Sequence, residues 1–238
     1  MRINLALSAL LMSGGLLAAS APGDCVKGAG SPEKRTLSVA TFHGIVLQGA
    51  MDVQLSVAST PSVQVEAQAN IAELVMTEVK DGIWVIKTSK CYSTDKPFIV
   101  HIAVPEVDIV SIQGSGDVTG TGEFAATNMK FDVQGSGDVR MNVSAKEVRA
   151  SVQGSGDISL SGTCGMFYAA VQGSGDIKAG ELKTASAKAQ VEGSGDITVQ
   201  ATENLDANVQ GSGDVKYKGK PAHIDSKTQG SGDVKPVE

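Results

Sequence analysis

The chain has 238 residues and a formal net charge of −6 at pH 7, so its charge argues against nucleic acid or an anionic membrane as a partner. Aromatic residues make up only 4% of the chain, whereas glycine contributes 28 residues. This composition excludes a thick globular core rich in aromatic side chains and is typical of thin, regularly stacked layers.

The first predicted element is an export signal over residues 1–20. Arg2 gives it a positive start, and a run of apolar and small residues follows. We favour cleavage after Ser20, and a lipid anchor at Cys25 is disfavoured because Asp24 stands where a small residue is expected. The apolar run is short for a membrane span of about 20 residues. We therefore expect an exported protein, in the periplasm or at the cell surface, without membrane insertion after signal removal.

A linker is predicted over residues 21–35, and it contains the first of three cysteines. In an oxidising compartment two of the three could form a disulfide. We favour Cys25 with Cys91 as the pair, because Cys164 lies inside the repeat region downstream. Three unpaired cysteines, acting as small hydrophobic residues, remain the alternative.

Residues 36–110 predict an irregular β start that caps the structure following it. The stretch 45–53 looks like a degenerate copy of the downstream repeat, with Gly49 in the place of its first glycine. The 65 residues from Gly49 to Gly114 are enough for about three repeats. Within them we expect strands at 62–67, 82–87 and 97–104, a turn at Asp81-Gly82 and one helical turn within 70–75.

Residues 111–235 contain seven copies of the tetrapeptide GSGD. Successive first glycines are 21, 19, 19, 20, 18 and 19 residues apart, so one repeat is about 20 residues long. A catalytic motif is needed once, whereas a motif needed seven times is a building unit. The first glycines are Gly114, Gly135, Gly154, Gly173, Gly193, Gly211 and Gly230.

Each copy alternates apolar and polar residues, as residues 131–141 illustrate. This period of two predicts a strand with one buried face. A helix is excluded because its apolar residues would be three and four apart, and two central glycines would each cost roughly 1 kcal/mol. The expected inward column is Val133, Val152, Val171, Val191 and Val209.

Strands about 20 residues apart, without an Asn-Gly hairpin signal between copies, are most simply stacked in parallel. The sequence therefore predicts an all-β fold, a parallel β-solenoid with about 20 residues per coil. Segments such as 147–150 and 205–208 would form the second wall of each coil. The glycine pair of GSGD would either allow positive φ or let the opposite wall approach closely. Turns between the walls are expected at Gly120, Gly162, Gly180 and Gly219.

Residues 35–45, then 49–53, then Val104-Pro105 followed by the train of GSGD copies, carry a resemblance to a known family. Over residues 36–230 the chain resembles the bacterial family called putative auto-transporter adhesin, head GIN domain, a domain of unknown function. The resemblance implies an exported, right-handed parallel β-helix without known enzymatic activity.

The GSGD aspartates would form a column, with adjacent carboxylates about 4.8 Å apart. Such neighbours repel by about 1 kcal/mol in water and by roughly 3 to 4 kcal/mol at an effective dielectric constant of 20. Calcium between the coils is one solution, and we favour the other, in which each aspartate accepts N–H bonds in its own bend. Cations two residues later accompany four of the aspartates: Arg140, Lys178, Lys216 and Lys235. The candidate calcium ligands are Asp117, Asp138, Asp157, Asp176, Asp196, Asp214 and Asp233.

We expect no enzyme and no cofactor. His43, His101 and His223 are scattered along the sequence, and Trp84 is the only tryptophan that could stack on a sugar. The favoured function is a non-catalytic, exported binding or structural protein of the bacterial cell envelope, with an envelope protein or a glycan as partner. The alternatives are a calcium-binding rod and, third, a polysaccharide-active enzyme.

Overall fold

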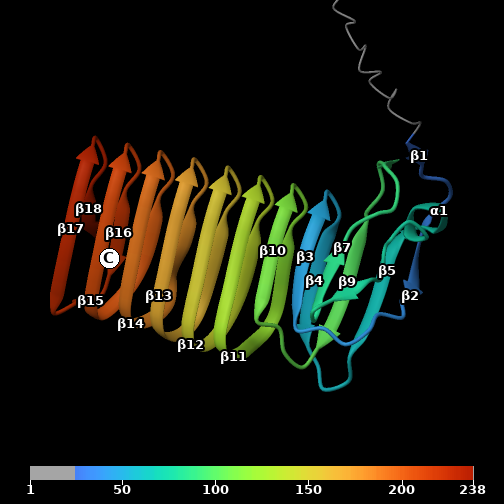
Figure 1. The fold of residues 1–238 in the computed structure, drawn as a ribbon, viewed down its shortest axis with the longest axis horizontal. Coiled ribbons are helices and arrows are strands. Elements are labelled where there is room, and N and C mark those ends of the chain that lie inside the picture. Colours follow the sequence, from blue (N-terminus) through green and yellow to red (C-terminus); the bar gives the residue numbers. More distant parts are fainter. Residues whose placement is uncertain (1–24, 238) are drawn as a thin grey trace, which may run out of the picture.

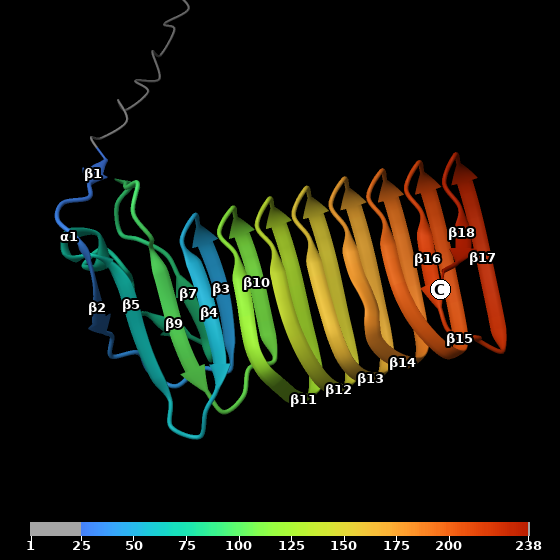
Figure 2. The same ribbon diagram turned by 180° about the vertical axis from the view of Figure 1, so that it is seen from behind.

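The computed structural model describes residues 25–237 as an all-β solenoid. Its coils have about 19 residues each and stack in parallel to form a rod (Figures 1 and 2), which confirms the predicted fold class. The predicted export signal and its cleavage site lie outside the described residues. Within residues 25–237, no helix is long and apolar enough to cross a membrane.

Five long strands build the regular part of the rod, and each runs along both walls of one coil (Figure 1). Each strand descends the first wall, turns at a bend and ascends the second wall to the GSGD edge, which lies at the top of Figure 1. Neighbouring long strands are parallel and in register at both walls. The strands are β11 (Val118–Gly135), β12 (Val139–Gly154), β13 (Ile158–Gly173), β14 (Ile177–Gly193) and β15 (Ile197–Gly211).

The core is a set of inward columns, one residue wide, between the two walls. The predicted valine column is confirmed, since Val133, Val152, Val171, Val191 and Val209 are all 0% exposed. β-branched side chains suit this position because they pack well on a pleated surface. A second column, on the first wall, is equally buried and consists of Val118, Val139, Ile158, Ile177, Ile197 and Val215.

One part of every coil has a constant length. The residue that starts the second wall pairs with its counterparts in the neighbouring coils, and so does the residue that starts the next first wall. These two residues are always ten positions apart, as in Val148 to Ile158 and Leu205 to Val215. We call this ten-residue part the GSGD segment. It starts at Met129, Val148, Phe167, Ala187, Leu205 and Ile224.

The rest of each coil varies in length. The part from Val118 to Met129 is longer by three residues than the corresponding part from Ile197 to Leu205. We call this part, which includes the end of the first wall and the bend, the bend segment. All the variation in repeat length therefore lies in the bend segments.

The cap begins with the degenerate repeat. β3 (Gly44–Gly49) pairs in parallel with β10 (Ile109–Gly114), and Gly49 faces Gly114, so the degenerate copy is a true layer of the stack, as expected. The interval does not form the three coils that its length would allow, because Gly49 and Gly114 are direct neighbours in the stack. The intervening chain instead leaves the stack on its N-terminal side and returns (Figure 2).

The chain between these two glycines forms one irregular parallel layer and an antiparallel strand that closes it. β7 (Ile83–Ile86) is parallel to β3, and β9 (Ile99–Val104) is parallel to β4 (Asp52–Val57). β5 (Ser62–Gln68), which precedes both β7 and β9 in the chain, pairs antiparallel with β9. Because β5 runs opposite to the strands of the coils, no further parallel coil stacks on β9, and the row of parallel coils ends at this layer.

The predicted linker is wrong for residues 32–35. β2 (Pro32–Thr36) pairs antiparallel with β5, so these residues belong to the folded cap. β1 (Val26–Lys27) also pairs, in parallel, with β8 (Tyr92–Ser93). The single short helix within residues 25–237, α1 (Ala69–Ala72), agrees with the expected helical turn.

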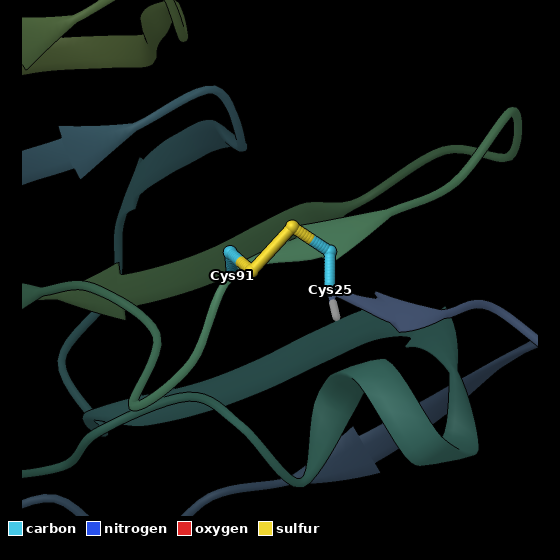
Figure 3. Close-up of a disulfide and its surroundings, with 2 residues drawn as sticks. All are labelled: Cys25 and Cys91. Carbon is cyan, nitrogen blue, oxygen red and sulfur yellow. A yellow bond between two sulfur atoms is a disulfide. The ribbon is translucent and has the colours of Figure 1, made fainter. Parts of the chain in front are cut away.

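Two further local predictions are confirmed in the cap. Asp81 and Gly82 have φ of 53° and 75° and join β6 (Val79–Lys80) to β7 as a hairpin turn. Cys25 and Cys91 form a disulfide, with their Cα atoms 4.8 Å apart (Figure 3), while Cys164 is free and buried. The disulfide links the first described residue to the turn before β8.

The C-terminal end of the rod is formed by short strands. β16 (Val215–Lys218) and β17 (His223–Gly230) pair with the two halves of β15, and β18 (Val234–Pro236) pairs with β16. All eight residues of β17 are exposed, in contrast to the alternating burial of the long strands.

Candidate binding groove

The first glycine of every GSGD copy is held in a conformation that favours glycine. Its φ lies between +126° at Gly230 and +154° at Gly114, so the expectation of positive φ is confirmed. A Cβ on either glycine of the pair would lie under 3.0 Å from a carbonyl oxygen of the preceding coil. The other alternative, close approach of the opposite wall, does not apply to these glycines, because the close neighbour is the adjacent coil at the same edge.

The backbone of the GSGD edge is bonded from coil to coil. The N–H groups of Ser155 and Gly156 both donate to the carbonyl oxygen of Gly135, at 2.9 and 3.1 Å, and the same pair of bonds recurs in each later coil. A single glycine carbonyl thus accepts two bonds from the next coil. This bonding leaves little freedom in chain length at this edge.

The aspartates form a ladder, although their partners differ from the expected ones. The Asp157 Oδ1 accepts the backbone N–H of Asp176 at 2.9 Å. Each GSGD aspartate from Asp117 to Asp214 accepts the backbone N–H of the aspartate in the next coil in the same way. The prediction that each aspartate accepts bonds in its own bend is wrong. The ladder starts earlier than the GSGD train, since Asp52 accepts the N–H of Asp117 at 3.1 Å. Asp52 was recognisable from its place in the degenerate repeat.

The second carboxylate oxygen binds the cations that follow the motif. Lys178 reaches back to the Asp157 Oδ2 at 2.5 Å, and Lys216 and Lys235 reach the preceding coil in the same way, at 2.6 Å. Arg140 instead binds Asp138 of its own coil at 2.6 Å. These ion pairs offset the repulsion along the column.

The pKa values of two aspartates reflect these contacts. Burial alone would raise the pKa of Asp157, but the hydrogen bonds from Lys178 and from the backbone N–H of Asp176 lower it below its ordinary value. The bond from Lys235 lowers the pKa of Asp214, and the backbone N–H of Asp233 adds to this effect. Within residues 25–237, no group of three or more His, Cys, Asp or Glu side chains is placed to hold a metal ion.

The outer face of the first wall carries two bulges. Between Thr119 and Glu123, β11 has two more residues than β12. Between Lys178 and Glu181, β14 has one more residue than β13. Gly120 and Gly180, which were expected at turns between the walls, lie in these bulges, while Gly162 and Gly219 have the positive φ of a tight bend.

A groove of about 550 Å³ lies between and beside the bulges, over β12 and β13. Gly120 lines it on one side and Gly180 on the other, and side chains of β15 and β16 extend it towards the C-terminal end. We call it the first-wall groove. Its polar lining side chains are Thr119, Asn142, Ser159, Ser161, Glu181, Thr198 and Lys218, together with Arg140 and Lys178.

The charges of the groove are nearly balanced. Arg140 and Lys178 are already neutralised by ladder aspartates. Glu181 and Lys218 add one charge of each sign. The remaining polar lining side chains carry hydroxyl or amide groups, as in Ser159, Ser161 and Asn142. The lining therefore suits a polar ligand of low net charge that offers hydroxyl groups for hydrogen bonds.

The chain matches a family model described as putative auto-transporter adhesin, head GIN domain, over residues 41–221. The chain belongs to this family. The match includes the cap from Thr41 onward and all but the last GSGD copy, so both edges of the rod and the first-wall groove lie inside the head GIN domain.

Solved structures share the whole fold of this head GIN domain. It is 27% identical to a putative adhesin from Bacteroides fragilis, with a TM-score of 0.83, covering 89% of this chain and 100% of that one. It is 26% identical, with a TM-score of 0.74, to a putative lipid binding protein and to a putative adhesin from Parabacteroides distasonis. Each of these two comparisons covers 90% of this chain and 100% of the other. No curated protein matches.

The fold does not bring the three histidines together. His43 precedes β3 and hydrogen-bonds Asp108 at 2.7 Å, a contact that raises its pKa. His101 lies in β9 beside Glu66, and His223 lies in β17 at the other end of the rod. Trp84, expected to be available for a sugar, is 0% exposed in the cap core.

Sequence reasoning missed a half-buried aromatic residue that faces outward on the second wall. Tyr168 lines two hollows of about 280 and 520 Å³, and the Arg149 guanidinium lies over its ring, 4.1 Å from the centroid. The period of two was the signal for its outward position, because Phe167 and Ala169 point inward. The first-wall groove was also missed, although the GSGD glycines are spaced most widely in the two coils that carry the bulges.

Proposed function

We propose that this chain is a non-catalytic, exported binding protein of the bacterial cell envelope, and that the first-wall groove holds its ligand, a polar glycan. The observation that carries the proposal is the pair of bulges. A purely structural rod needs equal coils, whereas here two coils carry extra residues on the same wall, and a groove lies beside them.

The lining supports a glycan as the ligand class. Sugars present rows of hydroxyl groups, which hydrogen-bond to serine, threonine and asparagine side chains of the kind found along β12 and β13. A groove that crosses several coils suits an extended chain better than a compact small molecule. The adhesin description of the family supports binding as the role and an exported location.

The other functions have less support. A calcium rod would need carboxylate oxygens that the aspartate ladder already uses for backbone N–H groups and for lysine or arginine side chains. An enzyme would need acid and base groups gathered in a cleft. The first-wall groove instead has Glu181 as its one carboxylate among hydroxyl groups and cations.

The test measures binding of purified bacterial envelope polysaccharides on an array, followed by titration calorimetry of the best binder. Ser161→Tyr would fill the groove, and we expect it to weaken binding at least about tenfold. Ser151→Tyr is the matched control, because both serines are half-buried, hydrogen-bonded once and on neighbouring coils, but Ser151 faces the second wall.

Two results would contradict the proposal. Binding of no polysaccharide in the panel would argue against a glycan, and unchanged binding by Ser161→Tyr would argue against the groove. If Ser151→Tyr alone abolished binding, the ligand would lie on the second wall beside Tyr168.

A further inference from the structure

The C-terminal end of the rod presents a complete strand to solvent. β17 pairs with β15 on one side, and among residues 25–237 no strand pairs with its other side. Ile224 in this strand is 47% exposed, whereas Leu205, which faces it in β15, is buried. The unpaired backbone groups and the exposed isoleucine make β17 an edge on which a further strand can form.

The two ends of the molecule treat their edges differently. At the cap, β2 is the last strand beyond β5. It begins with Pro32, which has no N–H to offer, and continues with Glu33, Lys34 and Arg35. Proline and a run of charges are common protections against edge pairing. β17 contains no proline, and its two full charges, Asp225 and Lys227, have opposite signs.

We propose that β17 is the interface for a second copy of this chain, paired antiparallel about a two-fold axis at Ser226. In that register Asp225 lies directly opposite Lys227 of the partner subunit, and the symmetry repeats the contact on the other side of the axis. A two-fold interface uses the same patch on both copies, so one strand supplies both halves of the charge pairing.

The charges select this register over its neighbours. A shift that makes Asp225 the axis residue places two aspartates opposite each other, and a shift to Lys227 places two lysines opposite each other. A shift by a single residue would turn the inward face of one copy outward. Among these registers, the one centred on Ser226 therefore places opposite charges against each other and keeps the inward faces of both copies on the same side.

The inward face of β17 gives the pairing a modest apolar gain. Ile224, Ser226 and Thr228 stand in register with the buried residues Leu205, Ala207 and Val209 of β15. A partner strand would extend these columns across the axis and cover Ile224. On the first wall, β18 pairs with β16 over only three residues, so β18 offers a much shorter strand edge than β17. One paired strand is a small interface, and we expect a weak dimer.

The experiment is sedimentation velocity of the purified protein at concentrations from about 10 µM to 1 mM. The wild-type protein should convert from monomer to dimer within this range. Asp225→Lys and Lys227→Asp should each raise the dimer dissociation constant at least about tenfold, because like charges then face each other twice. Asp95→Lys is the control, since it makes the same charge change on an exposed residue of the cap.

Charge-swap variants give the sharpest result. The double variant D225K/K227D restores opposite charges and should dimerise like the wild-type protein. An equimolar mixture of the two single variants should form heterodimers at concentrations where each single variant alone is still mainly monomeric. Thermal unfolding within a few degrees of the wild-type protein would establish that each variant is folded.

Three outcomes would overturn the proposal: a monomeric wild-type protein at the highest concentration, a dimer unaffected by the single variants, or a double variant that stays monomeric while the wild-type protein dimerises. The first-wall groove lies on another strand set, so loss of glycan binding and loss of dimerisation can be distinguished in the same variants.

Discussion

The two edges of the rod follow different rules. At the GSGD edge every coil uses the same ten-residue segment, the same glycine pair and the same aspartate contact. At the bend edge the corresponding segments differ in length by up to three residues, as the stretches from Ile197 to Leu205 and from Val118 to Met129 show. At the GSGD edge every coil carries a glycine pair whose Cβ atoms would lie under 3.0 Å from a backbone oxygen of the adjacent coil, so that edge is uniform. At the bend edge such glycines stand only in some coils, as at Gly162 and Gly219, and the other coils carry bulges and a groove there.

The largest expected effect comes from changing the length of a GSGD segment. One glycine inserted between Ser174 and Gly175 would displace the bonds that both residues donate to Gly154 and the contact between Asp157 and Asp176. We expect a loss of at least about 4 kcal/mol in the free energy of unfolding, since each lost bond contributes about 1 kcal/mol or more. Urea denaturation followed by circular dichroism measures it.

The control insertion is one glycine between Gly165 and Met166, in the bend segment of β13. We expect a loss of no more than about 1.5 kcal/mol, because the native bend segments already differ by up to three residues. Equal losses from the two insertions would remove the distinction between the edges.

The second effect concerns single glycines. In Gly175→Ala the new Cβ would lie under 3.0 Å from the backbone oxygen of Gly156, which cannot move without displacing the adjacent coil. We expect a loss of about 3 kcal/mol, typical of overpacking against fixed atoms. The measurement is the midpoint of urea denaturation at constant slope.

Gly180→Ala is the matched control, because neither glycine has a positive φ, and Gly180 lies in β14 while Gly175 lies two residues before its start. A Cβ on Gly180 would meet the methyl of Thr198 at 3.0 Å and the end of the Lys218 side chain at 3.5 Å. These atoms can rotate away, so we expect a change within about 1 kcal/mol. A loss as large as that of Gly175→Ala would mean that both edges are equally tight.

A smaller effect is expected in acid. The pKa values of Asp157 and Asp214 are lowered in the folded protein, so their stabilisation is present above the ordinary aspartate pKa and is lost as pH falls through their folded values. Stability should therefore fall below about pH 4. In the double variant D157N/D214N, which keeps the Oδ1 acceptors, the fall should be shallower. Urea denaturation at pH 5 and pH 3 gives the loss in the free energy of unfolding for each protein. Equal losses in the wild-type protein and the double variant would contradict the ion pairs of the aspartate ladder.

The smallest expected effect is that of calcium. Because the ladder oxygens bind backbone N–H groups and cations, thermal unfolding in chelator should overlay unfolding in millimolar calcium. A bound ion at a hundredfold excess over its dissociation constant would stabilise the fold by about 2.7 kcal/mol. A melting temperature that rises with calcium, and falls back in Asp157→Ala, would restore the calcium rod.

The sequence was enough to predict the regular part of the fold. Alternation at Val171 and its counterparts defined the inward face, and the spacing of the glycines defined the stacking, because both depend on local periodicity. The same periodicity is shared by parallel and antiparallel strands. For this reason it could not show that the chain between Gly49 and Gly114 turns back as β5 and β9 instead of forming coils.

The candidate site was less predictable, for two physical reasons. An aspartate such as Asp157 has N–H donors both in its own bend and in the next coil, and only the three-dimensional register decides between them. The groove arises from differences in length between neighbouring coils. The positions of Gly120 and Gly180 were visible in the sequence, but their alignment on one wall was not.

Deletion of Gly180 tests the division of roles between the edges most directly. It would make this coil as long as the coil before it and bring the first wall of β14 level with β13, which removes one side of the groove without touching the GSGD segment. We predict a free energy of unfolding within about 1 kcal/mol of the wild-type value, together with at least about a tenfold loss of polysaccharide binding. A loss of stability as large as that of the insertion at Gly175, or unchanged binding, would contradict the account.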